Sequence, residues 1–311
     1  MARRRPGSRG SRSGSGWLFL LGLLIGAGAL YFYLKGSPPR LAPGRGEGAP
    51  AQRELPRRGR STGRPPAASD HVEPTPVTPV SAASGPVHGV RVALVVDDLG
   101  ASVSDLQPLE ELGVPVTYAV LPFAEETPQV VSELRQRRAE ILLHLPMEPK
   151  NGEDPGPGAL LQGMTDEELR DKTLAALRAV PGAVGVNNHM GSLLSAEEGP
   201  MTAVLGVLAA RGLFFLDSRT SAQSVGFEVA RRLGIPAAER QVFLDGDPSP
   251  TAIRSQFERL LGLARTHGAA IAIGHPHPDT LAVLTAEVPK ARALGYEFVP
   301  VSYLLTRAGG D

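Results

Sequence analysis

The chain has 311 residues, and its 32 Lys and Arg are balanced by 32 Asp and Glu, so the formal net charge is zero. A neutral chain gives no global electrostatic reason to bind nucleic acid, and we expect no nucleic-acid partner. There is no cysteine, which excludes disulfides and thiolate metal sites. Any metal must therefore be held by His, Asp, Glu or water.

Residues 1–16 are rich in arginine and precede a run of uncharged, mostly apolar residues that ends near Lys35. Residues 17–34 have about the length of a membrane-spanning helix, which needs roughly 20 residues. Because clustered arginines favour the cytoplasmic side, we expect a cytoplasmic N-terminus, a single-pass anchor and an exported, periplasmic remainder. A cleaved signal peptide is the alternative, since Ala27 and Ala29 form a small-x-small pattern inside the run.

Residues 35–88 contain many Pro, Gly, Ser and Arg and few large apolar residues. Such a composition cannot bury enough apolar surface to fold, and it predicts a disordered linker. Its arginines could contact anionic lipid, but simple solvation of the linker is the favoured interpretation.

Residues 89–308 alternate between short apolar, β-branched runs and stretches with helical spacing. The runs are 91–96, 116–121, 141–145, 183–186, 213–216, 241–244, 269–273 and 297–301. The helical stretches are 103–112, 127–138, 165–180, 201–211, 226–233, 252–266 and 281–294. This alternation predicts one α/β domain, and seven or eight parallel strands favour a closed (β/α) barrel over an open doubly wound sheet.

Local signals support the expected helix ends. Thr165 and Glu168 have the spacing of a capping box. Glycines follow several helical stretches, where helices commonly terminate: Gly113, Gly212, Gly234, Gly268 and Gly295. No glycine-rich phosphate loop of the dinucleotide or Walker type follows the first apolar run.

Titratable and amide side chains gather where the predicted strands end, which is the catalytic rim of a (β/α) barrel. Four of the seven histidines fall there, beside several aspartates. In chain order the rim residues are Asp97, Asp98, His144, Asn187, Asn188, His189, Asp217, Asp245, His275 and His277.

Adjacent Asp97 and Asp98 are costly to ionise together unless a cation or a shared proton relieves their repulsion. One carboxylate and two imidazoles are a common hydrolytic ligand set that leaves positions for water and substrate. Asp98, His144 and His189 could supply that set, with Glu148 as another possible ligand. We expect a divalent metal, with Zn²⁺ favoured.

These motifs resemble the polysaccharide deacetylase (NodB-homology) superfamily, and most closely its divergent polysaccharide deacetylase branch. The resemblance covers about residues 90–305. It is carried by Val95-Val-Asp-Asp-Leu-Gly100, His144-Leu-Pro-Met-Glu-Pro149, Val186-Asn-Asn-His-Met-Gly191 and Ile271-Ala-Ile-Gly-His-Pro276. It implies that Asp97 is the catalytic base and that Asp98 is a metal ligand.

The second motif departs from the family pattern, because Glu148 stands where a second histidine is usual. We expect His189 to supply the missing imidazole, with Glu148 as the less favoured substitute. The usual arginine-containing third motif is not evident. The resemblance gives His275 the role of general acid, and Asp217 would line the site and orient that histidine.

Asn188, Asp245 and His277 are further candidates for lining the site. The function that follows is metal-dependent hydrolysis of acetyl groups on an envelope polysaccharide or peptidoglycan-type glycan. A non-catalytic envelope protein that binds a glycan or a partner is the alternative. Hydrolysis of a phosphoester or a glycosidic bond is a third interpretation. The carboxylates could serve a glycosidase, but the histidine set fits a glycosidase less well.

Overall fold

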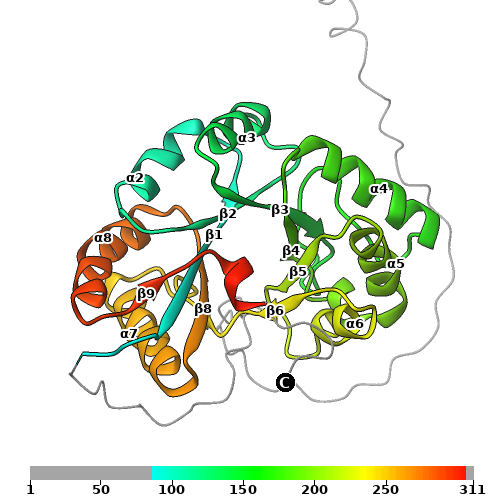
Figure 1. Ribbon diagram of the computed structural model, residues 1–311. Helices are drawn as coiled ribbons and strands as arrows, with labels where there is room; N and C mark the ends of the chain where they lie inside the picture. The colour runs from blue at the N-terminus through cyan, green and yellow to red at the C-terminus, as the bar shows by residue number, and fades with distance from the viewer. Residues whose placement is uncertain (1–85, 306–311) are drawn as a thin grey trace, which may run out of the picture. The chain divides into compact units, whose positions relative to one another are not determined.

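Eight parallel strands form one curved sheet within residues 86–305, the part of the chain that the computed structural model describes (Figure 1). Their order is β6-β5-β4-β3-β2-β1-β8-β7, and a short ninth strand, β9, pairs with the start of β1. The bounds are β1 (Arg91–Leu99), β2 (Thr117–Val120), β3 (Glu140–Met147), β4 (Gly185–Met190), β5 (Phe214–Asp217), β6 (Ala237–Glu239), β7 (Val242–Phe243), β8 (Ala269–Gly274) and β9 (Glu297–Phe298).

The sheet is a half-barrel, so the prediction of a closed barrel is wrong. Within residues 86–305 no pairing joins β6 to β7, the two ends of the strand order. Only two residues connect β6 to β7, and their backbone amides donate to different strands, one to β5 and one to β8. Arg240 N donates to Asp217 O on one side, and Gln241 N donates to Ile271 O on the other, each at 3.0 Å. The chain crosses the gap here instead of closing it.

The predicted helices are confirmed, with small shifts at their ends, and they cover the outer face of the sheet (Figure 1). They are α2 (Leu106–Glu110), α3 (Thr127–Gln136), α4 (Asp166–Ala179), α5 (Glu198–Ala209), α6 (Gly226–Arg232), α7 (Pro250–His267) and α8 (Pro278–Ala293). The capping box at Thr165 and Glu168 is present, with both reciprocal bonds. All five predicted terminal glycines have positive φ, which a residue without Cβ adopts without strain.

The buried apolar residues lie on the two faces of the sheet. The larger cluster fills the space under the helices and includes Val92, Leu94 and Val96 of β1. The smaller cluster lies inside the half-barrel and takes the alternate positions, among them Ala93 and Val95. This period of two is the ordinary geometry of a strand.

A 3-10 helix, η3 (Val301–Leu304), covers the inner cluster at the amino end of the strands (Figure 1). Val301 N donates to Oγ1 of Thr117, the first residue of β2, at 3.0 Å. The amino end of the half-barrel is therefore filled with apolar side chains. Its carboxyl end is left for polar ones.

The predicted anchor (residues 17–34) and the linker up to residue 85 lie outside the described residues. Among residues 86–305, no helix combines the length and the apolarity needed to cross a membrane.

Candidate active site

Strand alternation decides which rim residues face the interior. Asp97 continues the inward series of Ala93 and Val95, and His144 follows inward Leu142 on β3. His275 continues the inward positions of β8. These side chains therefore extend the inner face of the half-barrel at its carboxyl end.

Asp98 reaches the same place by a different route. Simple alternation would point it outward, but its φ is +61°, and the pairing of β1 with β2 shifts register between Val96 and Leu99. Met190, which directly follows His189, is another non-glycine residue with positive φ, at +50°. Strained backbone of this kind is concentrated at functional sites.

Asp98, His144 and His189 converge from three separate strands. Asp98 Oδ1 lies 3.1 Å from His144 Nε2 and 2.8 Å from His189 Nδ1, and the two ring nitrogens are 3.2 Å apart. The sequence-based expectation that these three residues meet is thus matched by their placement. Burial alone would raise the pKa of Asp98, but the adjacent His144 and His189 hold it well below its ordinary value.

The donor set fits a divalent cation. Asp98 Oδ1 is buried, yet within the described residues it has no correctly oriented hydrogen-bond donor. A buried carboxylate oxygen without a hydrogen bond is costly, whereas a cation shared with two imidazole nitrogens would satisfy it. Asp98, His144 and His189 could therefore hold the metal.

Asn187 connects the candidate base to a candidate ligand. Its Oδ1 lies 2.9 Å from His144 Nδ1, and its Nδ2 donates to Asp97 Oδ1 at 2.8 Å. An amide oxygen can only accept, so this contact requires a proton on Nδ1 of His144 and leaves Nε2 free to bind a metal. Asn187 is fully buried, and burial likewise raises the pKa of Asp97.

His275 is held by Asp245. The Asp245 carboxylate accepts from His275 Nδ1 at 3.0 Å, from the His275 backbone N at 2.6 Å and from Thr280 Oγ1 at 2.9 Å. Burial opposes the charged imidazolium, but Asp245 raises the pKa of His275 to about 9. His275 Nε2 lies 3.7 Å from Asp98 Oδ2, so the ring faces the candidate metal ligands.

The expectation that Asp217 orients His275 differs from the contacts observed. Phe214 and Leu216 are the inward residues of β5, so Asp217 points to the outer face. Its carboxylate accepts from Ser224 Oγ at 2.7 Å and from the backbone N of Phe227 at 3.1 Å. Asp217 thus secures the loop after β5 and the start of α6.

Other candidate residues have different surroundings. Glu148 Oε2 accepts from Gln162 N at 2.6 Å, which ties it to the following loop. Asn188 Oδ1 accepts from Ser218 N at 2.9 Å, and Asn188 lines the cleft. The His277 ring stacks against His275 with centroids 5.5 Å apart.

Arg240 is a site residue that the motif search missed. It follows inward Ala238, and its Nε and Nη2 donate to the carbonyls of Ser218 and Arg219 at 2.6 and 2.8 Å. Its guanidinium lies over the Phe243 ring, and burial lowers its pKa to about 10. The signal that could have found Arg240 is its position two residues after inward Ala238, directly beyond the end of β6.

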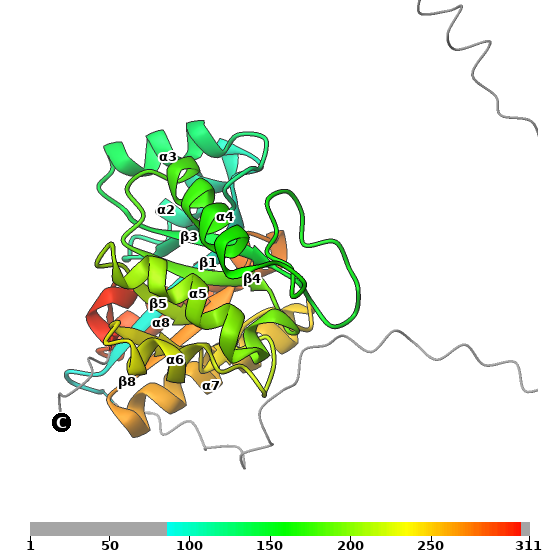
Figure 2. The ribbon, with the colours of Figure 1, turned by 90° about the vertical axis from the view of Figure 1, so that its right-hand side faces the viewer.

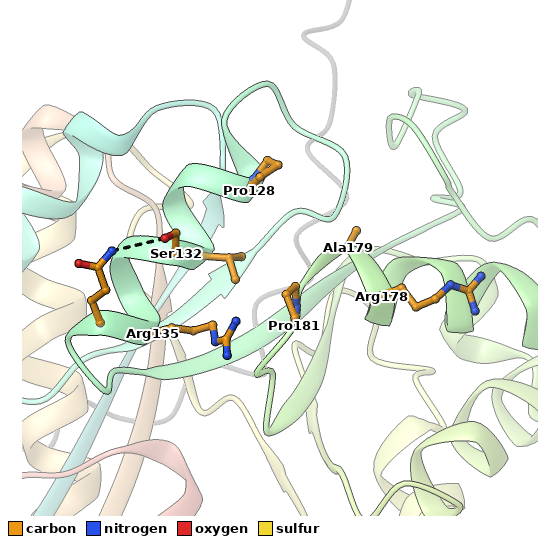
Figure 3. A pocket seen from close by; sticks show the side chains of 8 residues that line it. Pro128, Ser132, Arg135, Arg178, Ala179 and Pro181 are labelled. Carbon is orange, nitrogen blue, oxygen red and sulfur yellow. Dashed lines mark hydrogen bonds between the residues drawn. The ribbon is translucent and has the colours of Figure 1, made fainter.

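A cleft of about 440 Å³ opens over these groups. It is lined by Asp97, Asp98, His144, His189, His275 and Arg240, among others. A larger groove of about 620 Å³ between α3 and the end of α4 includes Ser132, Arg135 and Arg178, but no His, Asp or Glu (Figure 3). The chemistry therefore belongs to the smaller cleft.

A half-barrel of parallel strands with an Asp-His-His cluster at its carboxyl edge is the architecture of a polysaccharide deacetylase-like protein. Residues 94–305 match the family described as divergent polysaccharide deacetylase. The chain belongs to this family.

Several relatives share the domain. A solved structure, an uncharacterised protein ATU2773 of Agrobacterium tumefaciens C58, superposes with a TM-score of 0.65 at 30% identity, covering 70% of this chain and 90% of that one. The uncharacterised protein YibQ of Escherichia coli is 35% identical over 159 residues, 49% of this chain and 50% of that protein. An uncharacterised protein of Haemophilus influenzae is 35% identical over 141 residues, 45% of this chain and 50% of that protein. The chain thus matches about half the length of these curated relatives.

Proposed function

We propose that this domain is a metal-dependent hydrolase that removes acetyl groups from an envelope glycan. The observation that carries the proposal is Asp98 Oδ1, a buried carboxylate oxygen that lacks a hydrogen bond and faces two imidazole nitrogens. A divalent cation, for which we propose Zn²⁺, would supply polarisation of the acetyl carbonyl and a lowered pKa of water.

The chain's own residues divide the proton transfers between them. Asp97 accepts the proton of the attacking water, and Asn187 holds the Asp97 carboxylate in place through its 2.8 Å bond. His275 donates a proton to the departing amine or alkoxide, since its raised pKa keeps it protonated near neutral pH. Asp245 fixes the His275 ring so that Nε2 faces the cleft.

His189 takes the place that the resemblance gives to a second histidine in the second motif. Glu148, which occupies that position in the sequence, is engaged by Gln162. The altered motif is therefore compatible with a complete set of three ligands, because β4 supplies the third one.

The location and partners follow from the sequence and are part of the proposal. The apolar segment at 17–34 would anchor the chain in a membrane, and the half-barrel would act on polysaccharide or peptidoglycan-type glycan on the exported side. Detection of the full chain in the membrane fraction, with the half-barrel accessible to protease from the periplasmic side, would support this location. A fully cytoplasmic chain would contradict it.

The deciding experiment combines metal analysis with an acetate assay. The purified full chain, loaded with Zn²⁺, is incubated with acetylated glycans, including N-acetylglucosamine oligomers and O-acetylated polysaccharide, and free acetate is measured. Release that depends on Zn²⁺ and on Asp97 supports the proposal. A chain that retains metal and binds glycan but releases no acetate would favour the non-catalytic alternative.

A further inference from the structure

A second hollow lies beside Asp98 and His189, contiguous with the cleft that holds the candidate catalytic groups. It has a volume of about 290 Å³ and shares these two residues with the main cleft. The rest of its wall is mostly apolar: Leu121, Pro122, Phe123, Ala124, Pro146, Pro155, Gly156 and Pro157, with Asp154 as the other acidic residue. Asp98 and His189 therefore lie between the main cleft and a second hollow with a mostly apolar wall.

Phe123 is the aromatic residue of this apolar chamber. It follows β2, and 41% of its surface is exposed, although large aromatic side chains are usually buried. One edge of its ring lies directly against Gly158. A Cβ at Gly158 would fall 2.3 Å from Cε2 and 2.6 Å from Cδ2 of the ring. Gly158, whose φ is +80°, thus leaves the space that the ring occupies.

The loop that contains Gly158 is fastened at its base. Glu148 N donates to Leu160 O, and Leu160 N donates to Pro146 O, each at 2.9 Å. Between these bonds the loop projects from the body of the domain, in green in Figure 2. It contributes Asn151 and Glu153 to the main cleft and residues 154–157 to the second hollow.

We propose that Phe123 and its hollow form a binding subsite for a pyranose ring adjacent to the acetylated residue. This inference rests on the proposed function and identifies the substrate class as a glycan of at least two sugar units. The apolar C–H face of a pyranose matches an exposed aromatic and proline surface. The sugar hydroxyls need polar partners at the rim, and Asp154 offers carboxylate oxygens there.

The position of the ring favours a substrate unit over a protein partner. The hollow opens beside the same Asp98 and His189 that face the main cleft, so a chain with its acetyl group at these residues would place a neighbouring unit against Phe123. Binding energy from such a remote unit can be used to orient the reacting one.

The test compares a long and a short substrate in the Zn²⁺-loaded full chain. Phe123→Ala should lower kcat/KM for tetra-N-acetylchitotetraose about tenfold, which corresponds to about 1.4 kcal/mol. It should leave p-nitrophenyl acetate hydrolysis unchanged, because that substrate has no neighbouring sugar. Phe123→Trp should preserve hydrolysis of the tetramer.

Leu161→Ala is the matched control. Leu161 is 40% exposed and lies at the end of the same loop, but it lines neither hollow. Leu161→Ala should leave hydrolysis of both the tetramer and p-nitrophenyl acetate unchanged. Gly158→Ala, which forces the Phe123 ring to move, should reproduce the selective loss for the tetramer.

Equal losses for both substrates in Phe123→Ala, or no loss for the tetramer, would overturn the subsite. Calorimetric titration of the tetramer separates this inference from the catalytic one. A chain that releases no acetate but binds the tetramer about tenfold more tightly than Phe123→Ala would refute the deacetylase and retain the subsite. A chain that neither cleaves nor binds the tetramer would refute the subsite as well.

Discussion

Two groups of one aspartate and two histidines lie at the carboxyl edge of the half-barrel, and they differ in how their carboxylates are used. In both groups the potential ligand atoms lie within 4.8 Å of one another. Asp98 Oδ1, in the first group, accepts no well-oriented hydrogen bond within the described residues. Asp245, in the second group, accepts three bonds from His275 and Thr280.

This difference shows that ligand spacing alone does not identify a metal centre. A carboxylate that is already saturated by hydrogen bonds can position a histidine, and a cation there would have to displace those bonds. A carboxylate oxygen that faces imidazole nitrogens without accepting a hydrogen bond from them would be stabilised by a bound cation. We therefore propose that Asp98, His144 and His189 hold the metal and that His275 donates a proton.

The largest expected effect distinguishes the two groups directly. Asp98→Ala or His144→Ala should abolish metal retention, because each removes a direct ligand. Even loss of an outer partner costs 10–100-fold in metal affinity, and loss of a ligand should exceed this. Elemental analysis after desalting, together with titration of Zn²⁺, provides the measurement. His277→Ala is the control and should retain a full equivalent of metal. Metal loss in His277→Ala with retention in His144→Ala would reverse the assignment.

Replacement of the candidate base should separate binding from chemistry. Asp97→Asn keeps the shape of the side chain but removes its capacity to accept the proton of the attacking water. We expect acetate release to fall by roughly 10²–10⁴-fold, the usual contribution of a general base. The metal content should be unchanged, since Asp97 is not a member of the ligand set. Wild-type turnover in this variant would refute the role of Asp97.

A smaller effect tests the residues that hold the two histidines. Asn187 contacts Nδ1 of His144, and Asp245 contacts Nδ1 of His275. Asn187→Ala should weaken Zn²⁺ binding by roughly 10–100-fold, because the ring of His144, a proposed ligand, loses the contact that orients it. Asp245→Asn should leave Zn²⁺ affinity unchanged and lower kcat instead. Equal metal affinities in the two variants would remove the distinction between the groups.

Much of this arrangement could be predicted from the sequence. The alternation of apolar runs and helical stretches indicated the strands and helices, and the capping box at Thr165 is formed as expected. The meeting of Asp98, His144 and His189 also followed from their positions at strand ends. Parallel strands bring their carboxyl ends to one edge, so a strand-end position is informative across long sequence separations.

The remaining features depend on information that apolar runs do not carry. The prediction of a closed barrel was wrong because β6 and β7 are only three and two residues long, and β6 pairs with β5 while β7 pairs with β8. Asp217 was placed in the site by its strand-end position, although the period of two turns it outward. Asn187 was expected at the rim but without a role, and Arg240 was not expected in the site, although Asn187 contacts inward Asp97 and Arg240 follows inward Ala238 by two residues.

The smallest expected effect tests whether the site depends on overall stability. Thr165→Ala removes the capping box of α4, because the Thr165 hydroxyl accepts from Glu168 N. The substitution should lower the free energy of unfolding by about 1 kcal/mol. In a domain of this size that loss lowers the Tm by roughly 2–4 °C. Zn²⁺ affinity and acetate release at 25 °C should not change, because α4 supplies no residue to the ligand set or to the main cleft.

Asn187→Ala should instead reduce metal affinity beyond any loss of stability. If Thr165→Ala lowered metal affinity as much as Asn187→Ala does, the effect assigned to Asn187 would be one of general destabilisation, and the contrast between the two aspartate-histidine groups would lose its mechanistic basis.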